Sequence, residues 1–477
     1  MKKRLPALLL SACLLLTVPV SAVPDSFANF TRSKAYSGQF SDLTADSTFY
    51  TNISALYEYG LSVGKPDGSY GVKDSLTVGQ AVIFAGRIRS LYRTGGPEAG
   101  PAAYPVENGL TATPYLRYLQ AEGVLDDALD TQLTAAATRA QMAHILANLL
   151  PEKALPSIHT DLVTRCYATG RFIPDVTAAT PYYGDILTLY RKGISIGSDA
   201  AGSFLPDAPI TRGAVAAMLT RIIDPSLRVT PQWDPASVYS AKGATLSSLI
   251  QAGTYIPAPV TEAEMDESIR FMLSSGSNVL TLKYPSLTMV PAREVMMQAL
   301  SAVKVYCEQS YNQATCTYAP NGEITITFSA SATTETDISY YRETALHAAI
   351  AVHDELWRSG MIREDMSQWE KALVYYTWVC ENCAYDETAG DDSFSHLPYS
   401  LFTLGKAVCD GYTGAYNLLL KLEGIECSAY VQDSHIWTVA TLDGTEYHID
   451  TTWGDSSNDI NYVFFAMTPA QSLLYHK

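Results

Sequence analysis

Apolar residues recur at helical spacing along much of the chain and alternate at strand spacing in a few short stretches. Helices are expected over 261–273, 292–306, 340–357 and 368–383. Alternating positions predict strands over 278–284 and 323–328. Further along, Ala415, Leu418, Leu419 and Leu422 form one apolar helix face that ends at Gly424. The second half of the chain is therefore expected to mix helices with strands.

Two stretches rich in β-branched and aromatic residues, 435–442 and 445–453, flank Asp443-Gly444. That dipeptide is typical of a tight hairpin turn. A two-residue loop would place His435 opposite Thr452 and make His435 and Asp450 diagonal neighbours, with backbones roughly 7–8 Å apart. A four-residue loop keeps this pairing, whereas a three-residue loop would put the two side chains on opposite faces.

The first half of the chain repeats a spacing. Asp42 lies 18 residues before Gly60, and Asp175 lies 18 residues before Gly193. Each unit continues with a glycine turn, an aromatic residue and a helical run, and a weaker copy lies between the two. One unit is too small to bury its apolar faces, so three units are expected to stack, over 38–95, 104–150 and 171–225.

Length and composition bound the remaining organisation. A chain of 477 residues is expected to form two to four domains, and 47 % hydrophobic residues exclude general disorder. A formal net charge of −17 without a basic stripe argues against binding to nucleic acid. The Pro-, Ser-, Ala- and Gly-containing stretch 226–255 indicates a linker, and 256–332 indicates a small α/β domain without a motif. Packing and substrate positioning are both open roles for that domain.

Residues 1–22 combine a basic start, an apolar stretch and a small-residue cleavage site after Ala22, which is typical of an export signal. No later stretch reaches the roughly 18 to 20 uninterrupted apolar residues of a membrane span. The mature protein is expected to be exported, soluble and without a transmembrane anchor.

Removal of the signal would leave seven cysteines, an odd number that fits one free nucleophile and up to three disulfides. The favoured local bridge joins Cys307 to Cys316. Cys380 and Cys383 have metal-like spacing but lack a second pair of ligands, so they are expected to be structural thiols or a disulfide. No metal or cofactor is expected.

Cys409 follows a glycine-containing loop and begins a predicted helix. Unpaired N–H groups and the helix dipole at that position favour a thiolate, the form that acts as a nucleophile. His435 and Asp450 supply a base and an orienting acid. His448 is an alternative base, and His396 or Tyr399 is a candidate second donor to an oxyanion beside the N–H of Cys409.

The blocks 408–412, 435–437 and 447–453 resemble the core of the transglutaminase-like superfamily, whose members are papain-like; 378–386 and 395–399 resemble segments that precede the cysteine. The resemblance implies an α+β catalytic domain over 335–477, in which Cys409 attacks a carbonyl, His435 transfers the proton and Asp450 holds the imidazole. Members often read His-Ala-Trp-Asn, so Ile436 beside the base predicts a narrower site.

The repeats resemble S-layer homology repeats, which hold exported proteins on Gram-positive-type cell walls through a secondary cell-wall polysaccharide. Thr138-Arg139 and Thr211-Arg212 match the Thr-Arg signature of that family, which implies that Arg139 and Arg212 contact acidic groups of the polymer. The first repeat carries Val78 in place of the arginine. The alternative is that both arginines only interact with the ends of their helices.

The expected fold is therefore multidomain, with all-α S-layer homology repeats followed by an α+β papain-like transglutaminase-like domain. The expected function is that of a cell-wall-attached thiol enzyme that acts on amide or peptide bonds through an acyl-enzyme. Hydrolysis is favoured over cross-linking because no sequence feature binds an amine or excludes water. The alternatives are a protein-glutamine transglutaminase and a non-catalytic surface binding module on the same fold.

Overall fold

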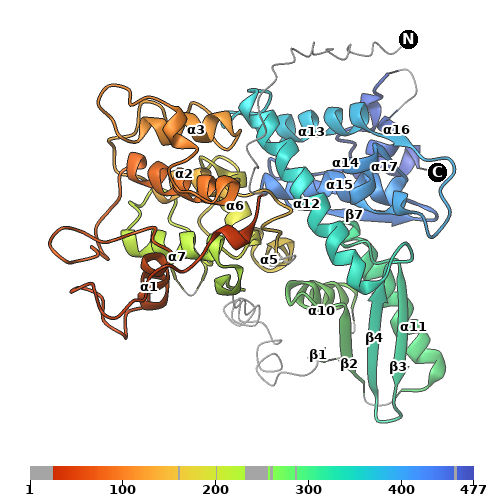
Figure 1. Cartoon of the computed structure of the whole chain (residues 1–477). Helices are drawn as coiled ribbons and strands as arrows, with labels where there is room; N and C mark the ends of the chain where they lie inside the picture. The colour runs from red at the N-terminus through yellow and green to blue at the C-terminus, as the bar shows by residue number, and fades with distance from the viewer. Residues whose placement is uncertain are drawn as a thin grey trace.

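The computed structural model describes residues 25–158, 162–199, 201–230, 256–257, 261–284, 287–455 and 459–476. They form an N-terminal helical module, a small sheet-and-helix domain and a C-terminal domain (Figure 1). The predicted export signal and residues 231–255 of the predicted linker lie outside the described residues. None of the described helices combines the length and the apolar run needed to cross a bilayer.

Three helix pairs make up the helical module. They are α1 (Tyr50–Glu58) with α2 (Val78–Thr94), α3 (Thr113–Ala121) with α4 (Arg139–Ala147), and α6 (Tyr183–Arg191) with α7 (Arg212–Ile223); α5 (Leu162–Thr169) precedes the third pair. The second helix of each pair begins after a threonine, at Thr77, Thr138 and Thr211, whose hydroxyl accepts a backbone N–H of the first turn. This shared cap sets where each of these helices starts.

The three pairs close into a ring. Leu76 N–H donates to the carbonyl of Ile210, Ile210 N–H donates to that of Ala137, and Ala137 N–H donates to that of Leu76. Helix packing follows the same cycle, because α2 contacts α3, α4 contacts α6, and α7 contacts α1. The expectation of all-α repeats therefore needs an addition, since isolated β-bridges, such as Ser75 with Thr211, join the helical units.

The small domain packs two helices, α10 (Glu262–Ser274) and α11 (Met289–Lys304), on a four-stranded sheet in the order β1-β2-β4-β3. The strands are β1 (Ile256–Pro257), β2 (Val279–Lys283), β3 (Gln313–Tyr318) and β4 (Glu323–Ser329). Leu280, Leu282, Ile324, Ile326 and Phe328 are buried. Because β1 pairs only with β2 and β3 only with β4, β3 lies at an edge of the sheet.

The C-terminal domain is built around α15 (Cys409–Leu422), which is buried from Gly411 to Leu422. Three helices, α12 (Glu335–Arg358), α13 (Gln368–Asn382) and α14 (Pro398–Leu404), pack around it together with a three-stranded sheet. That sheet has the order β7 (Cys427–Gln432), β8 (His435–Leu442), β9 (Thr445–Ile449). The remaining elements are β5 (Ala384–Tyr385), β6 (Lys406–Ala407), α16 (Thr451–Gly454), α17 (Pro469–Tyr475) and the 3-10 turns η1 (Phe27–Asn29), η2 (Pro101–Ala103), η3 (Pro225–Leu227), η4 (Cys307–Gln309), η5 (Phe394–His396) and η6 (Tyr462–Phe464).

The predicted hairpin is confirmed. Leu442 pairs with Thr445, and both turn residues, Asp443 and Gly444, have positive φ, as a tight two-residue turn requires. The second strand ends four residues earlier than the expected 445–453. Because β9 stops at Ile449 and the chain turns into α16, Thr452 does not pair with His435.

The three parts share one buried apolar cluster. Helix α5 of the helical module packs against α10, and α6 packs against α12. Tyr167 in α5 donates its hydroxyl to Glu308 in η4 across 2.7 Å, and η4 in turn packs against α15. The small domain and α15 are therefore in direct contact.

Candidate active site

Cys409 is the first residue of α15, directly after β6 and Val408. Its side chain packs against Cys307, Ala429 and Ile436, so residues of the small domain and of the sheet cover it. Backbone N–H groups of Asp410 and Ile436 hydrogen-bond to its sulfur. The predicted position of the cysteine at a helix N-terminus is confirmed.

The expected thiolate at that position is wrong for the resting protein. Burial raises the pKa of the Cys409 thiol to about 12, and the Asp410 carboxylate adds to the rise. The N–H groups of Asp410 and Ile436 act in the opposite direction but do not overcome it. The sulfur therefore rests as a thiol and needs a base to become nucleophilic.

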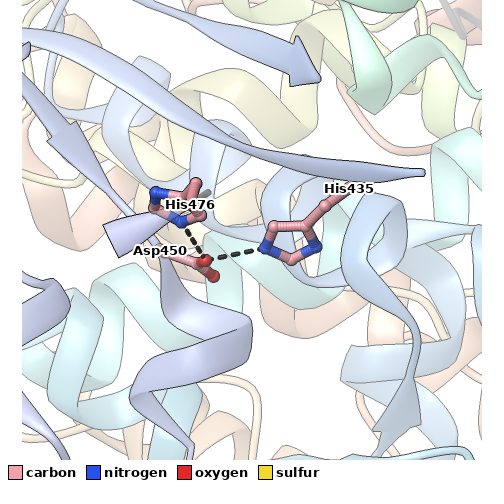
Figure 2. Close-up of side chains that lie close together, drawn as sticks. All are labelled: His435, Asp450 and His476. Carbon is pink, nitrogen blue, oxygen red and sulfur yellow. Dashed lines mark hydrogen bonds and ion pairs between the residues drawn. The ribbon is translucent and has the colours of Figure 1, made fainter. Parts of the chain in front are cut away.

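His435, the first residue of β8, reaches the buried carboxylate of Asp450 (Figure 2). Its Nε2 lies 2.7 Å from Asp450 Oδ2, which leaves Nδ1 as the ring nitrogen that the carboxylate does not use. Asp450 caps α16, where its other oxygen accepts the N–H groups of Thr452 and Trp453. Burial opposes ionisation of Asp450, but its hydrogen bonds with His435 and His476 outweigh burial and lower its pKa.

His476 contacts the same carboxylate, which the sequence did not indicate. Its Nε2 lies 2.9 Å from Asp450 Oδ2, and its Nδ1 lies 2.9 Å from the carbonyl oxygen of Ser472. The ring is stacked between Trp437 and Trp453, with centroid distances of 3.8 and 4.4 Å. Both ring nitrogens are therefore engaged, and the ring lies against two indoles. His476 stands outside every recognised motif, so only the folded structure brings it to the site.

His435, Asp450 and His476 could also be considered as metal ligands, because their three ligand atoms lie within 4.8 Å of one another. Both histidines use Nε2 to reach the same carboxylate oxygen, however. Those contacts have the length of hydrogen bonds, and they account for the cluster without a metal ion.

The other candidate side chains lie elsewhere. His448 accepts the indole N–H of Trp437 at 2.9 Å, and burial lowers its pKa. His396 has Nδ1 2.9 Å from Asp410 and Nε2 3.2 Å from the carbonyl of Gly390, so both nitrogens are engaged. Tyr399 packs edge-on against Tyr341. The structure brings His435 rather than His448 to Asp450.

One cleft of about 370 Å³ is lined by both Cys409 and His435. Its walls come from the η4–β3 segment, from the turn between β7 and β8, and from the segment that leads into η5. Three carboxylates, Asp391, Asp410 and Asp433, face this cleft together with Lys304. A larger cavity of about 1010 Å³ lies between α5, α10 and the β7–β9 sheet, but neither Cys409 nor His435 reaches it.

Arg139 and Arg212 join neighbouring repeats. The guanidinium of Arg139 lies over the ring of Phe204 and that of Arg212 over the ring of Tyr70, each at 4.9 Å, and each Nε donates to the carbonyl of the residue beneath it. Arg139 is only 9 % exposed, whereas Arg212 is half-buried. Both arginines thus hold the aromatic turn of the next repeat, a contact that differs from the helix-end alternative.

Two carboxylates also brace the same turns. Asp42 accepts the N–H groups of Tyr70, Gly71 and Val72, and Asp175 accepts those of Phe204 and Leu205. The repeated aspartates in the sequence therefore have a structural role.

The predicted disulfide between Cys307 and Cys316 is not formed. Cys307 is buried in η4, where the side-chain amide of Asn417 lies 3.7 Å from its sulfur, whereas Cys316 belongs to β3 of the sheet. Cys380 and Cys383 are buried thiols that face the carbonyl groups of Thr451 and Ala384. All seven cysteines of the described residues are unbridged.

Comparison with known proteins supports this reading of the chain. Residues 357–449 match the model of the transglutaminase-like superfamily, and residues 39–82 and 173–216 match that of the S-layer homology domain. The kyphoscoliosis peptidases of mouse and human are each 24 % identical over 119 residues, which cover 21 % of this chain. The aligned part spans only 18 % of those relatives. Both expected resemblances are confirmed, and the first and third repeats are the two that match.

Proposed function

We propose that this chain is a cell-surface thiol enzyme that cleaves amide bonds in peptides, with Cys409 as nucleophile, His435 as base and Asp450 as the orienting acid. The observation that carries the proposal is that Cys409 and His435 line one cleft while a buried carboxylate fixes the imidazole. The match to the transglutaminase-like superfamily supports it, as does the name peptidase that the mouse and human relatives bear.

Catalysis starts from a thiol and a neutral imidazole. As the sulfur of Cys409 bonds to the substrate carbonyl carbon, its proton moves to Nδ1 of His435, and the carbonyl oxygen becomes an oxyanion. Asp450 stabilises the imidazolium through Nε2. The imidazolium then protonates the departing amine, which leaves a thioester on Cys409. His435 next takes a proton from water as its oxygen attacks the thioester carbon. The C–S bond then breaks, the carboxylic acid leaves, and His435 returns the proton to the Cys409 sulfur.

Hydrolysis is favoured over transfer to an amine. Water outnumbers any amine, so cross-linking requires a site that selects the amine or excludes water. The walls of the cleft beside Cys409 come largely from loop segments, and we assign none of them to the binding of an amine.

The test follows ammonia release, peptide cleavage and amine incorporation when the mature protein meets unfolded peptides, a glutamine-containing peptide and a labelled primary amine. Cleavage that disappears in Cys409→Ala is expected. Incorporation of the amine that depends on Cys409 would instead make the chain a transglutaminase. Peptide binding without turnover in any arm would favour the binding module.

Thiol labelling tests the base. Because the thiol pKa is raised to about 12, reaction of Cys409 with iodoacetamide at neutral pH depends on proton transfer to His435. His435→Ala is expected to slow labelling, whereas Asp450→Asn should retain labelling and lose on the order of 10⁴-fold in turnover. If His448→Ala stops labelling and His435→Ala does not, the assignment of the base is wrong.

We further propose that the helical module binds a secondary cell-wall polysaccharide on a Gram-positive-type envelope, with Arg139 and Arg212 in contact with it. The match of two segments to the S-layer homology domain supports this. Arg212 is the more accessible of the two, so Arg212→Ala should reduce sedimentation with purified walls more than Val78→Ala. Because both arginines also join repeats, each variant needs a thermal-unfolding control. Full retention by a folded Arg139→Ala, Arg212→Ala chain would contradict the proposal.

A further inference from the structure

The small domain forms part of the cleft beside Cys409. Asn312, Gln313 and Ser331 line that cleft together with the catalytic residues. The side chains of Asn312 and Ser331 are hydrogen-bonded to each other, and the Ser331 hydroxyl donates to the carbonyl of Asp391 across 2.6 Å. This wall is therefore tied to the catalytic domain at the point where β3 begins.

Strand β3 leads away from the cleft with one edge unpaired. Ala319 N–H donates to Glu323 across 2.9 Å, and the antiparallel register pairs Gln313 with Ser329. Hydrogen-bonded and outward-facing positions alternate along an edge strand, so 313, 315 and 317 face β4. The N–H and C=O groups of Ala314, Cys316 and Tyr318 consequently face outward. Among the described residues, none of these outward groups has a backbone hydrogen bond to another strand.

We propose that the outer edge of β3 binds an extended stretch of linear polypeptide as an added strand, and so presents the neighbouring amide of that polypeptide to Cys409. This inference rests on the proposed function, and it names the substrate class: an unfolded or extended protein segment. An edge strand recognises such a segment through its backbone, with little demand on side chains. The occupant is a substrate segment because the edge and the cleft are continuous. Gln313 lines the cleft, and Ala314, the next residue, is the first whose backbone groups face outward.

The geometry sets a length requirement. From Ala314 to Tyr318 the strand rises roughly 13 Å, which is about five residues of a paired peptide. A substrate with only one or two residues beyond the reactive amide reaches Cys409 but not the edge. Longer linear peptides should therefore react faster than short amides with the same reactive group.

The test uses randomised linear peptides that carry an internal vinyl sulfone, with five residues on each side, so that addition of the Cys409 thiol to the double bond fixes the register. The rate of Cys409 modification on the full mature chain is measured by mass spectrometry. N-methyl groups are placed on alternate residues of one arm, in two complementary patterns. One pattern removes the N–H groups that would pair with β3, and the other removes only those that point away from it. For one methylation pattern on one of the two arms we expect modification of Cys409 to be about tenfold slower, which corresponds to the loss of one or two hydrogen bonds. Equal rates for both patterns on both arms would overturn the proposal.

A protein variant gives a second, independent measurement. Ala314→Pro removes one outward donor without touching the hydrogen bonds to β4, a position where edge strands accept proline. It should slow modification by the long probe about tenfold and leave a vinyl sulfone without peptide arms unaffected. An unchanged rate with the long probe would contradict the edge site. If neither probe nor iodoacetamide modifies Cys409, the proposed function fails. The edge site is then tested separately, by hydrogen exchange of the β3 amides in Cys409→Ala with and without the unmodified peptides. Peptides that give no protection of these amides would overturn the edge site.

Discussion

The Asp450 carboxylate serves two imidazoles, and only one of them faces the cleft. His435 lines the cleft, while His476 is buried between Trp437 and Trp453. A carboxylate that accepts from a second, buried donor is held in one orientation, and its ionised form is favoured. Under the proposed mechanism, His476 is a positioning residue that acts on His435 through Asp450.

We expect His476→Ala to lower kcat/KM about tenfold or more, because Asp450 loses one of its charge-assisted hydrogen bonds. The pH profile of kcat/KM should shift as well, since the Asp450 that steadies the His435 imidazolium is less firmly ionised. His476→Gln, which keeps a donor, should recover part of the loss. The measurement is made at a temperature at which the variant is folded. If the variant is less stable but its pH profile of kcat/KM is unchanged, His476 has only a packing role.

His396 provides a prediction of pH dependence. Its hydrogen bond to Asp410 raises its pKa above the ordinary value of about 6.5. A raised pKa in the folded state means that the stabilisation is fully present below about pH 6.5 and is lost as the pH rises through the folded-state value. The difference in the free energy of unfolding between the wild type and His396→Gln should therefore be largest near pH 5.5 and shrink at higher pH.

His448 is the matched control, because burial lowers its pKa. The sign is then reversed: its neutral form is favoured by folding, so its contribution is present above about pH 6.5 and falls as the medium becomes more acidic. Chemical denaturation of His396→Gln, His448→Ala and the wild type over this pH range measures both contributions. A His396 contribution that grows with pH would contradict the assignment of the pair.

At this scale the sequence predicted His435 and Asp450 largely from local rules. The Asp443-Gly444 turn fixes the register up to the pair of Thr438 with Ile449, and Asp450 follows directly after that pair, where it reaches His435 as the cap of α16. It did not predict His476, whose contact depends on the long-range packing of α17. The state of the Cys409 thiol was also mispredicted. Helix position is visible in the sequence, whereas the cover over the sulfur is tertiary and comes from Cys307 of another domain and from Ala429 and Ile436 of the sheet.

Among the elements, the approach of the η5 segment to α15 depends on a glycine. A Cβ on Gly411 would lie 2.4 Å from the carbonyl oxygen of Ser395, and that oxygen accepts the N–H of Val408, the residue that caps α15. We expect Gly411→Ala to lower the free energy of unfolding by about 1–3 kcal/mol and to reduce turnover, because the backbone before Cys409 must shift. Denaturation and turnover of the same preparation give both values.

Gly390→Ala is the control for this change, since its nearest new contact would be an ordinary 3.4 Å from the side chain of Asp392. It lies in the same domain and should alter neither quantity by much. If both substitutions behave alike, close packing at Gly411 is not what positions Cys409.

The helices and the longer strands could be predicted because their apolar periodicity is local; α13 and β4, for example, lie within a residue or two of expectation. Strand β3 was missed because its residues, Gln-Ala-Thr-Cys-Thr-Tyr, carry little apolar alternation, and its pairing with β4 compensates for that. Strand β1 has only two residues, and its pairing with β2 is not encoded by its own pattern. Whether such segments form strands depends on the strand with which they pair in the folded protein.

At the scale of the whole molecule, the sequence predicted repeats joined to a second domain by a linker. It did not predict that the helical module packs directly against the small domain and the C-terminal domain. The Tyr167 hydroxyl donates to Glu308 in a buried position, and the ammonium of Lys421 in α15 lies 3.5 Å from the same carboxylate. Elsewhere, a Cβ on Gly184 would lie 2.0 Å from the Asp354 carboxylate, so α6 and α12 approach closely. Arg191 and Glu343 form an ion pair across the same interface.

These contacts predict that the helical module and the catalytic domain unfold together. We expect Tyr167→Phe and Glu308→Gln to be non-additive in the full chain, with a coupling of about 0.5–3 kcal/mol in a double-mutant cycle. Tyr167→Phe removes the donor of the buried hydrogen bond, and Glu308→Gln removes the charge of its acceptor. Tyr59→Phe is the control: its hydroxyl contacts Asp224 inside the helical module, so it should show no coupling to Glu308→Gln. Separate thermal transitions for the two parts, or a coupling near zero, would mean that the module is only tethered. With the expected coupling, a chain bound to the wall through its repeats also holds η4, α15 and the cleft around Cys409 in a fixed orientation to the surface.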